Sequence, residues 1–230
     1  MGLNLKDLRC YVFSGQGVPA GYEDIYEKCF QMWKQVWSAT FIELNNNQKL
    51  FSDGFTRQTK IACIFAGDEC ATMVACREMN FAISAQREDS LLASWDNEAF
   101  ENLTVEGSRV SIASYLTVAP EFRGEIAPGI SLKTLSVMMS THCLLDSDCD
   151  VMTGTMRCNR GTDKSAYQAG ARFIKKSKMH GVDVDLVGFF KSDILKNYEE
   201  LTNLWSETLW KNRLDLTNTK SVTRSDRKAA

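Results

Sequence analysis

The sequence predicts an α/β (α+β) fold in which helices flank a mixed β-sheet. Two patterns carry this prediction. Large apolar residues recur every three or four positions in residues 22–44, as on one face of an amphipathic helix, whereas residues 182–190 alternate valine with aspartate before turning apolar, as in a half-buried strand. Helical and strand-like segments do not alternate regularly along the chain, which favours a mixed sheet.

Local patterns predict the elements in chain order. They are a helix at 22–44, strands at 59–66 and 70–81, a short helix at 90–103, a strand at 110–119, a helix at 129–145, a strand at 151–156, a short helix at 163–171, a strand at 182–190 and a final helix at 192–214. Gly67 and Asp68 supply a tight hairpin turn between the first two strands. Pro120 ends the third strand because proline lacks the N–H that a ladder needs.

The final helix is expected to begin with Ser192 or Asp193 as its cap, since both side chains favour that position. Beyond it, residues 217–230 hold one large apolar residue and are expected to form a flexible polar tail. Residues 1–216 are expected to form a single domain, because a chain of 230 residues can bury a large core.

Charge and hydropathy exclude several classes of protein. The 27 Lys and Arg residues against 29 Asp and Glu give a formal net charge of −2, which argues against nucleic-acid binding. No window approaches the roughly 18 uninterrupted apolar residues of a membrane span, and the first residues do not resemble a targeting segment. We expect a cytoplasmic protein, and the sequence leaves its oligomeric state open.

The eight cysteines are expected to be buried, reduced thiols. They lie mostly in apolar segments, and no two form a Cys-x-x-Cys pair. His142 and His180 lack the spacing of paired zinc ligands. We therefore expect no metal, and we expect no covalent catalysis because a serine or cysteine nucleophile would need a basic partner.

Residues 114–124 read Ser-Tyr-Leu-Thr-Val-Ala-Pro-Glu-Phe-Arg-Gly and precede a turn rich in glycine, alanine and proline, then a helix. A strand, a loop and a helix N-terminus in this order expose backbone N–H groups beside the positive end of a helix dipole. Such a junction can hold phosphate, and Arg123 would add a charge-assisted contact.

The pattern Leu-x-Val-x-Pro-Glu-Phe-Arg-Gly closely resembles the central motif of the GNAT acyltransferase superfamily. Asn159 and Gly170, eleven residues later, are similar to its next motif, so the resemblance spans roughly residues 59–190. It implies a mixed, mostly antiparallel twisted sheet flanked by helices. It also implies that an acyl-CoA is bound by Leu116, Val118, Arg123, Gly124, Ile126, Ala127, Gly129 and Asn159.

The sequence departs from the family pattern in two places. Ile126 and Pro128 stand where the family loop usually has glycines, and Glu125 brings a negative charge close to the expected phosphate. The position of the family's frequent catalytic tyrosine falls on Ala166, with Tyr167 beside it. Both departures weaken the resemblance to a standard acetyl-CoA site.

Other features look like the branch of the family that takes long acyl chains from acyl carrier protein, which includes N-acyl amino acid synthases and acyl-homoserine-lactone synthases. They are the aromatic helix, the following Asp-Gly-Phe-Thr-Arg at 53–57, and a strand that ends in Val-Ala-Cys-Arg at 74–77. That branch usually carries Glu-x-Ser-Arg on the central strand, where only Ser114 matches. Glu-Gly-Ser-Arg at 106–109 lies six residues too early, through a short insertion or by accident.

Acyl transfer from a thioester to an amine needs a deprotonated amine, a donor for the developing oxyanion and a route for the thiolate to leave. We expect a backbone N–H between Leu116 and Val118 to be the donor. Tyr167 is the candidate general acid, or else a partly buried helix residue. Glu106 is the candidate base, or else a solvated carboxylate in a turn.

Trp33, Trp37, Arg77 and Ser114 are the candidate substrate-binding residues. The two tryptophans, with Met73 and Met79, would either wall an apolar tunnel or belong to the ordinary core. Arg77, at a strand end, would hold a carboxylate or a carrier-protein phosphate, or lie free in water.

The favoured interpretation is an N-acyltransferase that moves an acyl group from a phosphopantetheine thioester, a long-chain acyl-ACP or acyl-CoA, directly to the amine of a small molecule such as an amino acid. Acyl carrier protein would then be a partner if it delivers the donor. The alternatives are a conventional acetyl-CoA-dependent N-acetyltransferase and a non-catalytic module that binds an acyl thioester.

Overall fold

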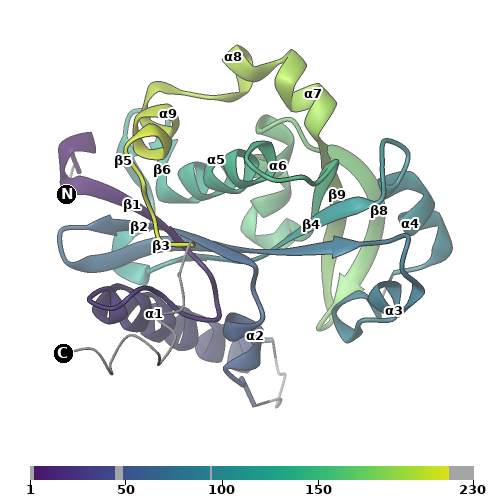
Figure 1. Ribbon diagram of the computed structural model, residues 1–230, viewed down its shortest axis with the longest axis horizontal. Helices are drawn as coiled ribbons and strands as arrows, with labels where there is room; N and C mark the ends of the chain where they lie inside the picture. The colour runs from purple at the N-terminus through teal and green to yellow at the C-terminus, as the bar shows by residue number, and fades with distance from the viewer. Residues whose placement is uncertain (1–2, 45–48, 94, 218–230) are drawn as a thin grey trace, which may run out of the picture.

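An eight-stranded mixed sheet runs through the computed structural model, which describes residues 3–44, 49–93 and 95–217 (Figure 1). In spatial order its strands are β10 (Leu214–Asp215), β1 (Leu8–Phe13), β2 (Lys60–Ala66), β3 (Glu69–Asn80), β4 (Arg109–Val118), β7 (Val151–Arg157), β9 (Val182–Phe190) and β8 (Arg172–Met179). The pairs β10–β1 and β4–β7 are parallel, and the other neighbours are antiparallel. The expected mixed, mostly antiparallel sheet is confirmed.

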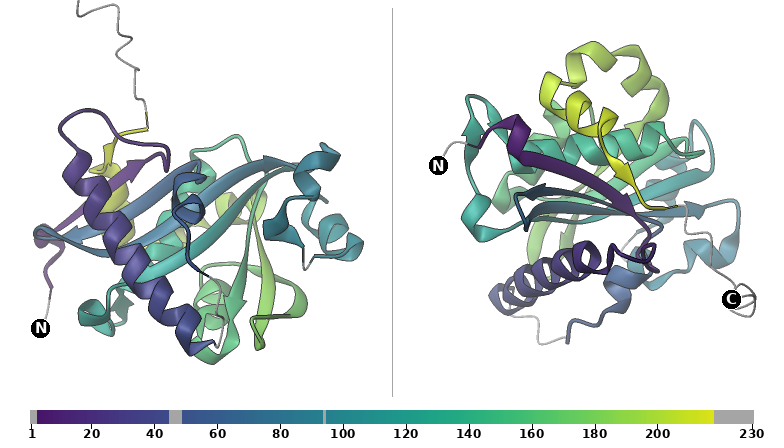
Figure 2. Two further views of the ribbon diagram at one scale, coloured as in Figure 1. Left: turned by 90° about the horizontal axis from the view of Figure 1, so that it is seen from below. Right: turned by 60° about the vertical axis from the view of Figure 1, so that its left-hand side comes forward.

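Helices cover both faces of this sheet (Figures 1 and 2). Helix α1 (Glu23–Glu43) crosses one face, and α5 (Leu132–Leu145) lies on the other with α6 (Thr162–Gln168) and α9 (Leu204–Lys211). Shorter helices are α2 (Asp53–Thr56), α3 (Ser84–Arg87), α4 (Asn97–Leu103), α7 (Lys191–Lys196) and α8 (Tyr198–Leu201). One buried apolar cluster joins α5 and α9 to the sheet, and another joins α1 to it.

The structure confirms the predicted hairpin at Gly67 and Asp68 and gives β9 the predicted bounds. The predicted final helix is wrong as a single element, because α7, α8 and α9 replace it. Asn203 caps the N-terminus of α9 and forms a capping box with Ser206. The N-cap residue of α7 is Phe190, rather than the predicted Ser192 or Asp193.

Two other predicted helices are shorter than expected. The segment 90–103 divides into a 3₁₀ turn (Ser90–Leu92) and α4, because the Asp96 side chain accepts a hydrogen bond from an N–H of the first turn of α4. Helix α5 begins only after Ser131, whose hydroxyl caps it. The residues before it form a hairpin of β5 (Glu125–Ala127) and β6 (Ile130–Ser131).

Strands β1 and β8 were not predicted. Strand β8 reads Arg-Phe-Ile-Lys-Lys-Ser-Lys-Met and lies at the edge of the sheet, where charged side chains reach water. The predicted tail falls almost wholly on residues 218–230, outside the described part of the chain.

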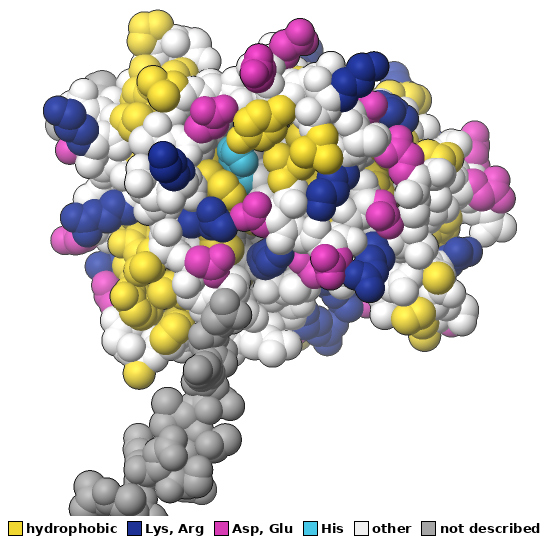
Figure 3. All heavy atoms as spheres, turned by 45° about the horizontal axis from the view of Figure 1, so that its top comes forward, with side chains coloured by type: hydrophobic (Ala, Val, Ile, Leu, Met, Phe, Trp, Pro, Cys, Tyr) yellow, Lys and Arg dark blue, Asp and Glu magenta, His cyan; other side chains and the backbone are white. Residues whose placement is uncertain are grey.

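Charges of both signs are interspersed on the face that carries α7, α8 and α9 (Figure 3). This distribution agrees with the small net charge of −2. Among the described residues, no helix has the length and apolarity that a membrane span requires.

A buried histidine joins α5 to α9 in this half of the molecule. His142 is 3% exposed, and its ring stacks on Trp210 with centroids 5.2 Å apart. Burial lowers the pKa of His142 from 6.5 to about 4, although the Asp146 carboxylate opposes this shift. As the pH falls, the unfolded chain therefore takes up this proton before the folded chain does.

We predict that the free energy of unfolding decreases between pH 6.5 and pH 4 through His142. His142→Phe keeps a ring against Trp210 but does not titrate, so over this range it should lose roughly 2 to 3 kcal/mol less stability than the wild type. Urea unfolding at several pH values measures the difference. Parallel pH profiles for the two proteins would contradict the prediction.

Candidate active site

Strands β4 and β7 separate in the middle of the sheet. They pair only from Val110 with Val151 to Ile112 with Thr153, although both strands continue beyond this point. Gly154 allows the close approach where they part, because a Cβ there would lie 2.8 Å from a backbone oxygen of β4. Beyond it, the edge of β4 that faces away from β3 has no strand partner in the described part of the chain.

A β-bulge bends β4 just after the separation. The register with β3 shifts so that Tyr115 and Leu116 together face Val74, and Tyr115 has a left-handed φ of +53°. The N–H of Ala119 donates to a β3 carbonyl at 3.0 Å. Since backbone groups alternate between the two edges of a strand, the N–H groups of Val118 and Leu116 point to the unpaired edge.

A first cavity of about 870 Å³ opens along this edge, between α1, β4, the N-terminal end of α5 and α6. Its lining includes several of the predicted donor-binding residues: Leu116, Val118, Arg123, Gly124 and Gly129. Three others lie elsewhere. Ile126 is buried in the core beneath α5, Ala127 pairs within the β5–β6 hairpin, and exposed Asn159 accepts a 3.3 Å hydrogen bond from Arg157.

The predicted phosphate loop is therefore not an open coil. Its middle forms the β5–β6 hairpin, and the loop returns to the cavity at Gly129. The N-terminal end of α5 borders the cavity with Lys133 and Thr134, and Arg123 also lines it. A helix N-terminus with two cations beside it provides the electrostatics that a phosphate needs.

A carboxylate from α1 reaches across this cavity. Glu43 accepts hydrogen bonds from Arg157 at 3.4 Å and from Arg160 at 2.5 Å. The Arg160 guanidinium holds the pKa of Glu43 below its ordinary value. An anionic ligand in the cavity would compete with Glu43 for the two arginines.

A second cavity of about 560 Å³ lies on the other side of the gap between β4 and β7. Its apolar lining includes Trp37, Phe41, Leu50, Phe51, Leu91, Trp95 and Tyr115. Its charged lining consists of Lys49, Asp53, Arg57, Arg77, Asp89 and Arg157. Trp37 and Arg157 line both cavities, so the two meet at the gap.

Two ion pairs occupy the charged wall of the second cavity. Arg77 lies 2.7 Å from Asp89, and Arg57 lies 3.1 Å from Asp53. Ser114 also lines this cavity, and its Oγ is buried without a hydrogen-bond partner. Arg77 and Ser114 thus both line the second cavity, and the Ser114 Oγ is the polar atom of the two side chains that remains unsatisfied.

Of the four residues expected to wall an apolar tunnel, only Trp37 lines a cavity. Trp37 lines both cavities and donates from Nε1 to Thr117 at 2.9 Å. Trp33 is fully buried under α1 and packs against Tyr115, and Met73 lies in the same core cluster. Met79 belongs to a different cluster, around Phe81.

Tyr167 and Glu106 lie outside the linings of both cavities. The Tyr167 hydroxyl donates to Asp185 at 2.6 Å, and burial together with this carboxylate raises the pKa of Tyr167 well above its ordinary value. Glu106 lies 3.5 Å from Arg172 and accepts a hydrogen bond from Ser192. The candidate general acid and the candidate base therefore lie neither beside either cavity nor beside the unpaired edge of β4.

The sequence reasoning missed the wall that α6 gives to the first cavity. Thr162, Ser165 and Gln168 line it at intervals of three residues, on one face of the helix. Ala166, at the family's tyrosine position, is buried instead. Helical spacing along 163–171 could have grouped these polar residues, but not shown which face meets the cavity.

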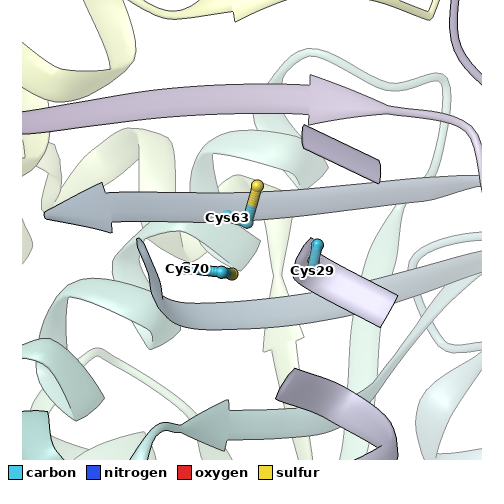
Figure 4. Close-up of side chains that lie close together, drawn as sticks. All are labelled: Cys29, Cys63 and Cys70. Carbon is cyan, nitrogen blue, oxygen red and sulfur yellow. The ribbon is translucent and has the colours of Figure 1, made fainter. Parts of the chain in front are cut away.

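Among the residues that the structure describes, two groups of side chains have ligand atoms close enough to hold a metal ion, within 4.8 Å of one another. Cys29, Cys63 and Cys70 come together from α1, β2 and β3 (Figure 4). The second group is Cys158, Asp163 and Asp185. All eight cysteines are free of disulfides in the structure, and seven are buried, which confirms the predicted burial of most of the thiols.

The two tryptophans of α1 should respond differently to truncation. Trp33→Ala should reduce the free energy of unfolding by about 3–5 kcal/mol, because it empties a fully buried site. Trp37→Ala should reduce it less, because the Trp37 ring already borders two cavities. Urea unfolding compares the two variants. Equal losses would contradict the assignment of Trp33 to the core and Trp37 to the cavity wall.

Comparison with solved structures finds similar folds at low sequence identity. FeeM, an N-acyl amino acid synthase from uncultured soil microbes, matches with a TM-score of 0.53 at 8% identity, over 87% of this chain and 98% of FeeM. BjaI, a CoA-dependent acyl-homoserine lactone synthase with SAM and isopentyl-CoA, matches with a TM-score of 0.57 at 9% identity, over 90% of this chain and 93% of BjaI. No protein-family model and no curated protein matches the sequence. The likeness concerns the fold alone: the chain shares the fold of an N-acyl amino acid synthase and an acyl-homoserine lactone synthase, the two kinds of protein that its sequence features resemble.

Proposed function

We propose that the protein is an N-acyltransferase that moves an acyl group from a phosphopantetheine thioester to the amine of a small molecule. One observation carries the proposal: two cavities meet at the unpaired edge of β4, where the N–H groups of Leu116 and Val118 point into the gap. This arrangement supports a reaction between two substrates that enter from opposite sides.

The first cavity suits the donor. Its edge strand offers backbone N–H and C=O groups in the pattern that the amides of a pantetheine arm can pair with. The phosphate end would lie at the N-terminus of α5, between Arg123 and Lys133. Arg160 would be released to the donor when an anion displaces Glu43.

The chemistry needs few side chains. A neutral amine attacks the thioester carbonyl, a C–N bond forms, and the carbonyl oxygen becomes an oxyanion that the N–H of Leu116 or Val118 stabilises. The C–S bond then breaks, and the proton lost by the amine ends on the departing thiolate. Tyr167 and Glu106 have no part in this scheme, because neither side chain lines either cavity.

The second cavity suits the acceptor and the acyl chain. Arg57 and Arg77 could bind a carboxylate, and Asp53 and Asp89 could bind an ammonium group before it loses its proton. The aromatic wall around Trp37 offers apolar surface for an acyl chain longer than acetyl. These features favour an amino acid as acceptor and a long-chain donor on CoA or on acyl carrier protein.

A panel of donors tests this function. Thermal unfolding is followed with CoA, acetyl-CoA, a long-chain acyl-CoA and an acyl carrier protein, and thiol release is then measured with amino acids. A ligand at about 100 times its Kd should add about 2.7 kcal/mol to the free energy of unfolding. We expect stabilisation by the long-chain donors and thiol release that depends on the amine. Binding without release would favour the non-catalytic alternative, and stabilisation by acetyl-CoA alone would favour the acetyltransferase.

Arg123→Glu should weaken donor binding by about tenfold or more, because it replaces a charge-assisted contact with repulsion. Arg109→Glu is the matched control, since Arg109 is exposed at the other end of β4, beside Asp148. Both affinities are measured by titration calorimetry with the donor that binds. Unchanged affinity in folded Arg123→Glu protein would exclude Arg123 from the phosphate site.

A further inference from the structure

Three polar side chains from separate segments converge behind α6. Cys158 lies in a 3₁₀ turn (Cys158–Arg160), Asp163 in the first turn of α6, and Asp185 on β9. Their ligand atoms, the Cys158 Sγ and one carboxylate oxygen from each aspartate, lie within 4.8 Å of one another. None of the three lines either cavity of the candidate active site.

The two carboxylates are incompletely satisfied. Asp185 is 7% exposed, and its Oδ2 accepts the Tyr167 hydrogen bond at 2.6 Å, but its Oδ1 is buried without a partner. The Oδ1 of Asp163 is also buried without a partner. In the described part of the chain neither carboxylate forms an ion pair, including with Lys176, the cross-strand neighbour of Asp185. Burial of a charged carboxylate oxygen that has neither a hydrogen-bond donor nor a cation beside it is strongly unfavourable.

The cluster of Cys29, Cys63 and Cys70 differs from this one, because it contains no carboxylate. Burial raises the pKa of Cys29 and Cys63, whereas, against the effect of burial, hydrogen bonds from these two thiols lower the pKa of Cys70 to about 5. Cys29 lies 3.7 Å from the Met73 sulfur, and Cys70 contacts the carbonyl oxygen of Thr72. Buried thiols pack as small apolar groups, whereas the second cluster holds two buried carboxylate oxygens without partners.

We propose that Cys158, Asp163 and Asp185 bind a divalent transition-metal ion of the zinc class. One thiolate with two carboxylates suits zinc, whereas magnesium and calcium prefer oxygen ligands alone. The ion would neutralise the two unpartnered oxygens and displace the thiol proton. The Tyr167 hydroxyl holds Asp185 by Oδ2, which leaves Oδ1 for the ion.

The site would fasten the 3₁₀ turn and α6 to β9. These segments carry Arg160, Thr162 and Ser165 of the first cavity, so the ion would fix one wall of that cavity. This role does not depend on the proposed reaction. It departs from the expectation of no metal, which rested on Cys-x-x-Cys and histidine spacing and so overlooked ligands spread from residue 158 to residue 185.

Metal titration tests the proposal. Untagged full-length protein is freed of metal with a chelator and titrated with Co²⁺, followed by Zn²⁺ in competition. We expect one Co²⁺ per chain, a thiolate-to-cobalt absorption band that Cys158→Ser removes, and displacement by Zn²⁺. Asp185→Asn should weaken binding by more than about 100-fold, and Tyr167→Phe by about 10-fold to 100-fold, because the hydroxyl orients the ligand.

Asp183→Asn is the matched control, because Asp183 lies on the same strand with an exposed side chain and should leave binding unchanged. Folding of Asp185→Asn is checked by its Tm in chelator. That Tm should equal or exceed that of the wild type, since the variant removes a buried charge and can still accept from Tyr167. Absence of Co²⁺ uptake by the wild type, or wild-type affinity in Asp185→Asn, would overturn the proposal. Loss of binding in Cys63→Ala alone would place the ion at the other cluster and would also overturn it.

Discussion

The parting of β4 from β7 is the constraint on which the rest of the site depends. A strand that leaves its neighbour exposes backbone N–H and C=O groups, and these groups cannot be buried without partners. They must therefore face water or a ligand, and a cavity lies along the free edge of β4. Gly154 keeps the two strands close at the point where they part, because a side chain there would press on the β4 backbone. A feature of the sheet thus creates the place where chemistry can occur.

Packing from α1 holds the bent strand in its shape. Tyr115 has a φ of +53°, a conformation that a bulky residue adopts only when its surroundings favour it. Its ring lies edge-on between Trp33 and Trp37, with centroids 5.4 and 5.0 Å away. Gly54 leaves room for its hydroxyl. The buried aromatic layer therefore aims the unpaired N–H groups, although only Trp37 of these two tryptophans reaches the cavities.

Electrostatics divides the neighbourhood into three regions. The wall of the first cavity carries more cations than anions, and Glu43 pairs with Arg157 and Arg160 there. The second cavity carries paired charges of both signs. The third region is the cluster of Cys158, Asp163 and Asp185, where one oxygen of each carboxylate is buried without a partner. The first two regions meet at Trp37 and Arg157, whereas Cys158, Asp163 and Asp185 line neither cavity.

The sequence by itself determined most elements and the loop that borders the first cavity. Periodicity identified α1, β2, β3 and β9, and the motif around Arg123 identified the strand and helix that border the first cavity. It did not distinguish Trp33 from Trp37, because helical spacing defines an apolar face but not what lies opposite each residue. Only the tertiary structure paired Tyr167 with Asp185 and gathered Cys158 with two aspartates, since these contacts join segments that the chain brings together only when the sheet and α6 pack.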